Sequence, residues 1–123
     1  MGREVKRRKV EPSEVNLLEL IPDQNILAEI TEEGLYVLLK PKYRHPWLIK
    51  HVLPRLKSPH FKIKLDDVGS FIWGLCDGQN TVEEIGSQLK ARFGDNVEPL
   101  YERLGQYFQN LEKNKFIVFK NLY

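Results

Sequence analysis

This sequence has one cysteine and no long hydrophobic run, and each scarcity excludes a class of protein. The single cysteine among 123 residues, Cys76, cannot form an internal disulfide, so we expect a reducing, cytoplasmic setting. No apolar stretch approaches the roughly 20 residues that cross a bilayer. The basic residues of segment 1–10 are not followed by the apolar core of a signal peptide. A chain of this length predicts one small domain with little room for a large enclosed active site.

Acidic residues are absent from one long segment. Residues 34–64 contain eight lysines and arginines and no aspartate or glutamate, whereas segments 1–33 and 65–123 each carry a net charge of −3. A basic run of this kind is typical either of a surface for an acidic partner or of a solvated loop. Composition leaves both interpretations open.

The first half of the chain predicts a hairpin between two irregular segments. Residues 1–24 are expected to form a basic tail and a short helix that begins at Ser13. Apolar runs at 26–31 and 35–39 predict two strands, and Gly34 in the loop between them can supply the positive φ of a tight turn. The proline-rich, basic segment 40–60 is expected to hold a short helix that Pro54 ends.

The second half predicts one more strand and three helices. Phe61, Ile63 and Leu65 alternate with Lys62 and Lys64, which is typical of a strand with its apolar side chains facing inward. Helices are expected after Asp66 as N-cap, after the capping box that begins at Thr81, and from about 96–99 to 113. The core face of the last helix should comprise Val97, Leu100, Leu104, Phe108 and Leu111. A final apolar stretch, 116–119, can return as a short strand or wing. The order predicts an α+β, winged helix-turn-helix-like fold in which a small antiparallel three-stranded sheet is followed by a three-helix bundle.

Chemistry-bearing residues are scattered rather than clustered. His45, His51 and His60 are not joined by a cysteine or carboxylate at metal-binding spacing, and no nucleotide-binding glycine loop is present. Cys76 ends an apolar helix without a neighbouring base, so it is expected to be a buried apolar side chain. We therefore expect no catalytic residue, no metal and no cofactor.

Segment 65–85 resembles the family of coenzyme PQQ synthesis protein D, the PqqD-like family. It has the leucine-aspartate start, the apolar helix, the Cys-Asp-Gly turn (76–78), the Thr-Val pair (81–82) and an isoleucine-bearing helix. Segment 111–117 resembles the family's closing helix and short apolar strand. The resemblance covers about 61–118, and residues 1–24 and 40–60 are additions to the pattern. It implies a peptide-binding domain over 25–123, with a basic insertion at 40–60.

The resemblance also implies a function. Such modules, called RiPP recognition elements, bind the leader segment of a ribosomally made precursor peptide without catalysing a reaction. They present it to a modifying enzyme, often a radical S-adenosylmethionine (SAM) protein. The identity of the peptide, of the enzyme and of its chemistry does not follow from the sequence, nor does the oligomeric state.

Strand addition is the expected mode of binding, because an extended peptide can pair with an open sheet edge and place alternate side chains in a neighbouring groove. We expect the edge to be the strand at 61–65 and the opposite wall to be the last helix. Proline in place of Ile63 is then expected to remove an edge donor. The candidate peptide-binding residues are Phe61, Lys62, Ile63, Lys64, Leu65, Tyr101, Arg103 and Tyr107.

Each of these assignments has an alternative. Lysines on an edge strand also prevent unwanted strand pairing, and tyrosines at helical spacing also complete cores. A winged-helix protein that binds nucleic acid is the alternative function, favoured by the basic segment. The last helix weakens it, because residues 97–113 carry a net charge of −1, and a helix that reads DNA needs basic and amide side chains.

Overall fold

The computed structural model describes residues 16–42, 45–55 and 59–122. Its strands are β1 (Pro22–Gln24), β2 (Ala28–Ile30), β3 (Tyr36–Pro41), β4 (His60–Lys64) and β5 (Ile117–Phe119). Its α-helices are α1 (Pro46–His51), α2 (Asp67–Leu75), α3 (Val82–Phe93) and α4 (Leu100–Lys113). Short 3₁₀ helices span Leu17–Glu19, Leu53–Arg55 and Gly94–Val97. The predicted α+β class and the small antiparallel sheet are confirmed, whereas the winged-helix and three-helix-bundle descriptions stay predictions.

The three-stranded sheet has the order β2-β3-β4, with both neighbouring pairs antiparallel. The predicted hairpin is confirmed, because Gly34 has a φ of 85° and its N–H donates to the carbonyl of Thr31 at 2.9 Å. Leu38 lies opposite Ile63 in this sheet and is fully buried. The sheet therefore contributes its central strand to the core.

A second, two-stranded sheet joins the ends of the described chain. β1 pairs antiparallel with β5, so that Pro22 lies opposite Phe119. The strand predicted at 116–119 is confirmed, but the sequence analysis assigned no strand to 22–24. Leu20, just before β1, is 7% exposed, so residues that we grouped with the N-terminal tail belong to the core.

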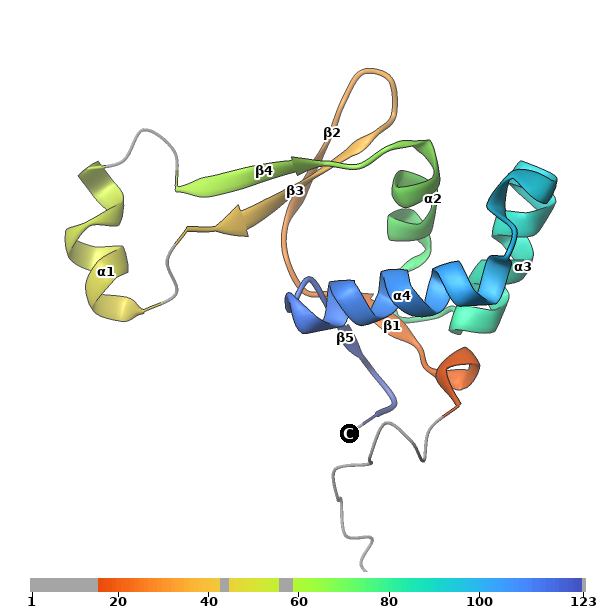
Figure 1. The fold of residues 1–123 in the computed structure, drawn as a ribbon. Coiled ribbons are helices and arrows are strands. Elements are labelled where there is room, and N and C mark those ends of the chain that lie inside the picture. Colours follow the sequence, from red (N-terminus) through yellow and green to blue (C-terminus); the bar gives the residue numbers. More distant parts are fainter. Residues whose placement is uncertain (1–15, 43–44, 56–58, 123) are drawn as a thin grey trace, which may run out of the picture.

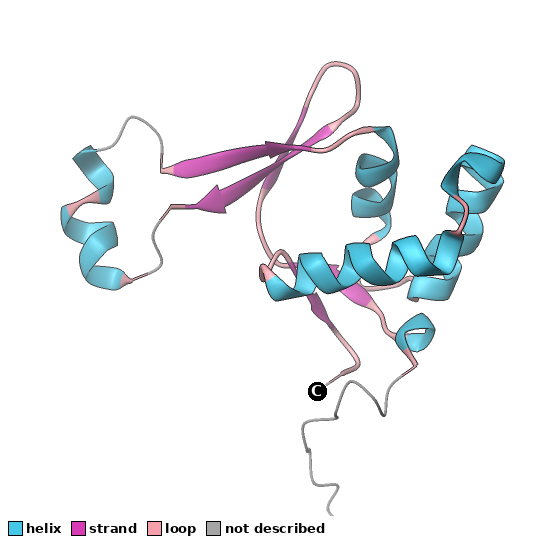
Figure 2. Cartoon of the chain, viewed as in Figure 1, coloured by secondary structure: helices cyan, strands magenta, loops and turns pink. Residues whose placement is uncertain are grey.

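Helices α2, α3 and α4 gather around one end of the three-stranded sheet (Figure 2). Asp66 caps α2 by accepting from the N–H of Gly69 at 2.7 Å, as predicted. The predicted capping box of α3 is also present, with Thr81 and Glu84 as its two side chains. The core face predicted for the last helix is buried at all its positions.

The other end of the sheet extends away from the helices as an arm. We use this name for β3, α1, the 3₁₀ turn Leu53–Arg55 and β4; α1 lies at its outer end (Figure 1). Two expectations are wrong here. Phe61 shares a face with Ile63 but is not buried: it is 55% exposed, because β4 has left the helices behind at that point. Pro54 does not end α1, which stops at His51, and instead lies in the 3₁₀ turn.

Two remaining expectations concern the N-terminal segment. The tail and the proposed Ser13 cap lie outside the described residues. The first observed helix is the 3₁₀ turn Leu17–Glu19, which Asn16 caps by accepting from the N–H of Leu18 at 3.0 Å. No helix in the described residues has the length and apolar content to cross a bilayer.

Candidate peptide-binding edge

The outer edge of β4 is the open edge predicted from the sequence. Within the described residues, β4 pairs with β3 on one side, and no strand pairs with it on the other. The same holds for β2, so this sheet has two open edges. β4 is the longer of the two, with five residues against three, and its chain continues directly into α2.

The register decides which backbone groups of β4 point outward. The N–H of Leu65 donates to the carbonyl of Tyr36 at 2.9 Å, and the N–H of Lys42 donates to the carbonyl of Pro59 at 3.0 Å. Because hydrogen-bonded and non-bonded pairs alternate in antiparallel sheets, the pairs Leu38–Ile63 and Lys40–Phe61 also bond to each other. The outward groups on this edge therefore include those of Lys62 and Lys64.

This geometry corrects one expectation about Ile63. Its N–H points toward β3, so proline at 63 would break the sheet itself rather than remove a donor from the open edge. The informative positions for an edge test are Lys62 and Lys64. Sequence alternation identifies which side chains share a face, but it does not say which backbone groups face the neighbouring strand.

The two faces of the sheet differ in character. Leu38 and Ile63 lie on the face toward α2 and belong to the core or pack against it. The lysine side chains of β4 lie on the opposite face, by strand alternation. Lys62 is placed 3.6 Å from the carboxylate of Glu29, and both groups are more than half exposed. Glu29 was not among the predicted site residues, because only the β2-β3-β4 order brings it near Lys62.

Ser70 fastens the sheet to α2. Its hydroxyl accepts from the N–H of Tyr36 at 2.9 Å and lies 3.5 Å from the carbonyl of Leu65. Ser70 is 5% exposed, and the ring of Tyr36 lies over Gly74 on the same helix. The C-terminal end of β4 is thus held rigidly beside the first turn of α2.

A pocket of about 170 Å³ opens beside this first turn, among α2, α3 and α4. We call it the helix pocket. Its lining is mainly aliphatic, with polar groups from an aspartate, an arginine and a tyrosine: Asp66, Val68, Gly69, Ile72, Leu89, Val97, Leu100, Arg103, Leu104 and Tyr107. A dry cavity of about 150 Å³ holds a benzene-sized ligand, so the helix pocket has room for one large apolar side chain.

Tyr107 and Arg103, two of the predicted peptide contacts, line this pocket, and their contact with a peptide stays a prediction. The hydroxyl of Tyr107 donates to the carbonyl of Gly69 at 3.4 Å. Burial raises the pKa of this hydroxyl, with smaller contributions from Cys76 and Asp66, so it remains a neutral donor. Arg103 donates to the carbonyl of Asn96 at 3.1 Å and keeps its guanidinium at the exposed rim.

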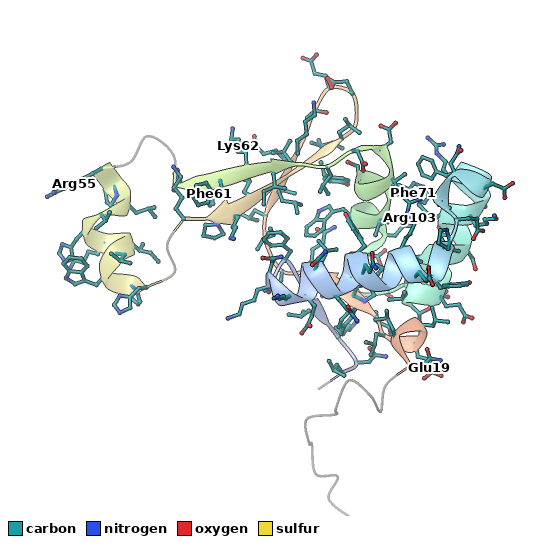
Figure 3. The ribbon with its side chains drawn as sticks, viewed as in Figure 1. Glu19, Arg55, Phe61, Lys62, Phe71 and Arg103 are labelled. Carbon is teal, nitrogen blue, oxygen red and sulfur yellow. The ribbon has the colours of Figure 1, made fainter. Side chains whose placement is uncertain are left out.

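The predicted residues do not form one cluster. Tyr101 lies on the other flank of α4, where its ring is near Gly86 of α3, and it does not line the helix pocket. Phe61 lies far along the arm from Arg103 (Figure 3). The structure therefore brings together the end of β4, Arg103 and Tyr107, and leaves Phe61 and Tyr101 apart from them.

Cys76 has the environment of a structural residue rather than of a nucleophile. It is fully buried, and its thiol lies 3.3 Å from the carbonyl of Ile72. Burial, followed by Asp77 and Asp23, raises the thiol pKa to about 12. No group of three or more potential metal ligands occurs in the described parts of the chain.

This burial predicts a loss of stability in alkali. The unfolded chain releases the Cys76 proton above about pH 8.5, whereas the folded protein retains it up to a pKa of about 12. Deprotonation therefore favours the unfolded state, and the free energy of unfolding should fall as pH rises from about 8.5 to 10. Urea unfolding at several pH values between about 8.5 and 10 measures this fall in the free energy of unfolding. Cys76→Ala should flatten the slope, and an unchanged slope would contradict the assignment.

Comparison with known proteins supports the resemblance read from segment 65–85. A family model described as coenzyme PQQ synthesis protein D (PqqD) matches residues 50–117, which is more than half of the chain. No curated protein and no solved structure matches significantly. The matched region begins within α1 and contains β4, α2, α3 and α4, and with them the open edge and the helix pocket. The chain therefore belongs to the PqqD family, the family of coenzyme PQQ synthesis protein D.

Proposed function

We propose that this protein is a non-catalytic module that binds the leader segment of a ribosomally made precursor peptide and presents it to a modifying enzyme. The observation that carries the proposal is the open edge of β4, which directs the backbone groups of Lys62 and Lys64 outward next to the helix pocket. Family membership links the chain to the synthesis of a PQQ-type product. A radical SAM enzyme is the partner that we propose.

An extended guest would pair with the outward groups of β4 and so add a fourth strand to the sheet. Guest side chains would then alternate between the two faces. Those on one face would approach Ile63 and Leu65, and beyond the end of β4 an apolar side chain would enter the helix pocket. Those on the other face would lie beside Lys62 and Lys64. The favoured guest thus alternates apolar with acidic residues.

Amide hydrogen exchange tests this mode of binding. The probe is the leader of a precursor encoded beside this gene or, if none is found there, the strongest binder from a library of peptides that alternate apolar and acidic residues. On saturation, the amides of Lys62 and Lys64 should become protected. The amide of Ile63, already bonded within the sheet, should change little. Protection confined to β2, or none on either edge, would refute strand addition at β4.

Charge reversal at Lys64 should weaken peptide binding modestly. An exposed ion pair contributes about 0.2–1 kcal/mol, so Lys64→Glu should raise Kd by up to about fivefold at low salt and by less at high salt. Calorimetry at two salt concentrations measures this. Lys64 is a cleaner position than Lys62, whose replacement would also affect Glu29. Lys113→Glu, on the last turn of α4, is the control and should leave Kd unchanged.

A further inference from the structure

A second concave surface lies on the face of the three-stranded sheet that points away from α2. It is a groove of about 430 Å³ between the segment just before β2, the outer part of β3, the first residue of β4 and α1. We call it the arm groove. Its lining is largely aliphatic and includes Ile26, Leu27, Leu39, Pro41 and Ile49. None of its lining residues belongs to the helix pocket, so the two sites are separate.

Two of the apolar side chains that line the arm groove are exposed to solvent. Leu27 is 72% exposed and Ile49 is 43% exposed, and both line the groove. Contiguous apolar exposure in a small protein usually marks an interaction site. Ile49 lies on α1, at the outer end of the arm (Figure 1), and neither Leu27 nor Ile49 belongs to the core cluster or packs against it.

The arm side of this groove carries charge of one sign. The arm falls within segment 34–64, which has eight basic and no acidic residues. Lys50 follows Ile49 directly on α1, and the lysine side chains of β4 share the groove's face of the sheet. Glu29 is the acidic residue on this face of the sheet, and Lys62 pairs with it. An occupant must therefore bring apolar side chains for the groove and negative charge for its surroundings.

These requirements exclude several occupants. The protein's own N-terminal segment is basic between Arg3 and Lys9, and a second copy would place one basic arm against another. Single-stranded nucleic acid binds on aromatic stacking platforms, whereas five of the seven residues that line the groove are aliphatic. A bilayer surface would not fill a concave site.

We propose that the arm groove is a docking site for an acidic amphipathic helix of a partner protein. Apolar side chains spaced at i, i+3 and i+4 would enter between Leu27 and Ile49. Carboxylates flanking that stripe would meet Lys50 and the lysines of β4. That this partner is the enzyme that receives the peptide rests on the proposed function; the chemistry of the site does not.

The test is a selection with a displayed library of random 18-residue peptides. The library is enriched on the wild-type protein and counter-selected on Ile49→Glu. The enriched sequences should be rich in Asp and Glu, with apolar residues at helical spacing. Fluorescence anisotropy of the best peptide should then show at least a tenfold loss of affinity for Ile49→Glu and for Leu27→Glu. Val118→Glu is the matched control, because Val118 is exposed to the same 43% as Ile49 but lies on β5.

Several outcomes would overturn this proposal: no enrichment, enriched peptides without acidic residues, or equal affinity for Ile49→Glu and Val118→Glu. Tighter binding of a 12-nucleotide single strand, or of vesicles containing anionic lipid, than of any selected peptide would also overturn it and would identify a different ligand. Leader-peptide binding by Ile49→Glu separates the two hypotheses. If Ile49→Glu still binds the leader peptide but no longer binds the helical peptide, the proposed function and the arm-groove proposal both stand. If the leader fails to bind even the wild type, the proposed function fails alone.

Discussion

Lys62→Pro is expected to weaken leader-peptide binding by about 5- to 150-fold while the protein remains folded. Proline removes the outward N–H of residue 62 and places a ring where the guest's carbonyl would lie. Leaving a polar group without its partner in a buried interface costs about 1–3 kcal/mol, which corresponds to this range in Kd. The fold should tolerate the change, because Lys62 lies opposite Leu39 in a pair that does not bond across β3 and β4.

Two further variants make the experiment specific. Lys62→Ala removes the same charge but keeps the N–H, so its affinity should stay within about fivefold of wild type. Ile63→Pro breaks a bond inside the sheet and should lower the melting temperature. Calorimetry measures the peptide affinity of all three variants, and thermal unfolding measures their melting temperatures. Equal affinity of Lys62→Pro and Lys62→Ala would show that the backbone edge does not bind the peptide.

Phe108→Ala is expected to destabilise the protein by about 3–5 kcal/mol, the usual range for a buried phenylalanine. Phe108 is fully buried on α4, and its ring centroid lies 6.4 Å from that of Phe119 on β5. Removing the Phe108 ring would therefore leave a cavity where α4 meets the two-stranded sheet. Because small domains have only about 5–15 kcal/mol of stability, urea unfolding should show a large shift of the midpoint.

Tyr101→Ala is the matched control on the same helix. Tyr101 is 49% exposed, and we expect its replacement to cost less than about 1 kcal/mol. It also tests the predicted peptide contact, because Tyr101 lies on the flank of α4 away from the helix pocket. Unchanged peptide affinity in Tyr101→Ala, together with a loss in Arg103→Ala, would place the guest on the α2 side of α4. The reverse result would move it to the α3 side.

Local signals in the sequence predicted much of the secondary structure. The capping box at Thr81, the N-cap at Asp66 and the positive φ of Gly34 depend on interactions over a few residues. The core face of α4 depends on helical periodicity alone. The short strand β1 carries no such signal, because its pairing with β5 joins segments almost a hundred positions apart. The sequence analysis grouped its residues with the N-terminal tail and short helix instead.

For the candidate site, too, some features followed from the sequence and others only from the tertiary structure. By itself the sequence determined that an alternating strand precedes a capped helix, that a long segment is purely basic, and that segment 65–85 has the PqqD pattern. Only the tertiary structure decided that Lys62 and Lys64, not Ile63, present their backbone outward, and that Tyr107 but not Tyr101 lines the helix pocket. It also brought apolar residues from the segment before β2, from β3 and from α1 together in one groove. The physical reason is that alternation and periodicity specify which side chains share a face, whereas strand register and helix packing specify what that face meets.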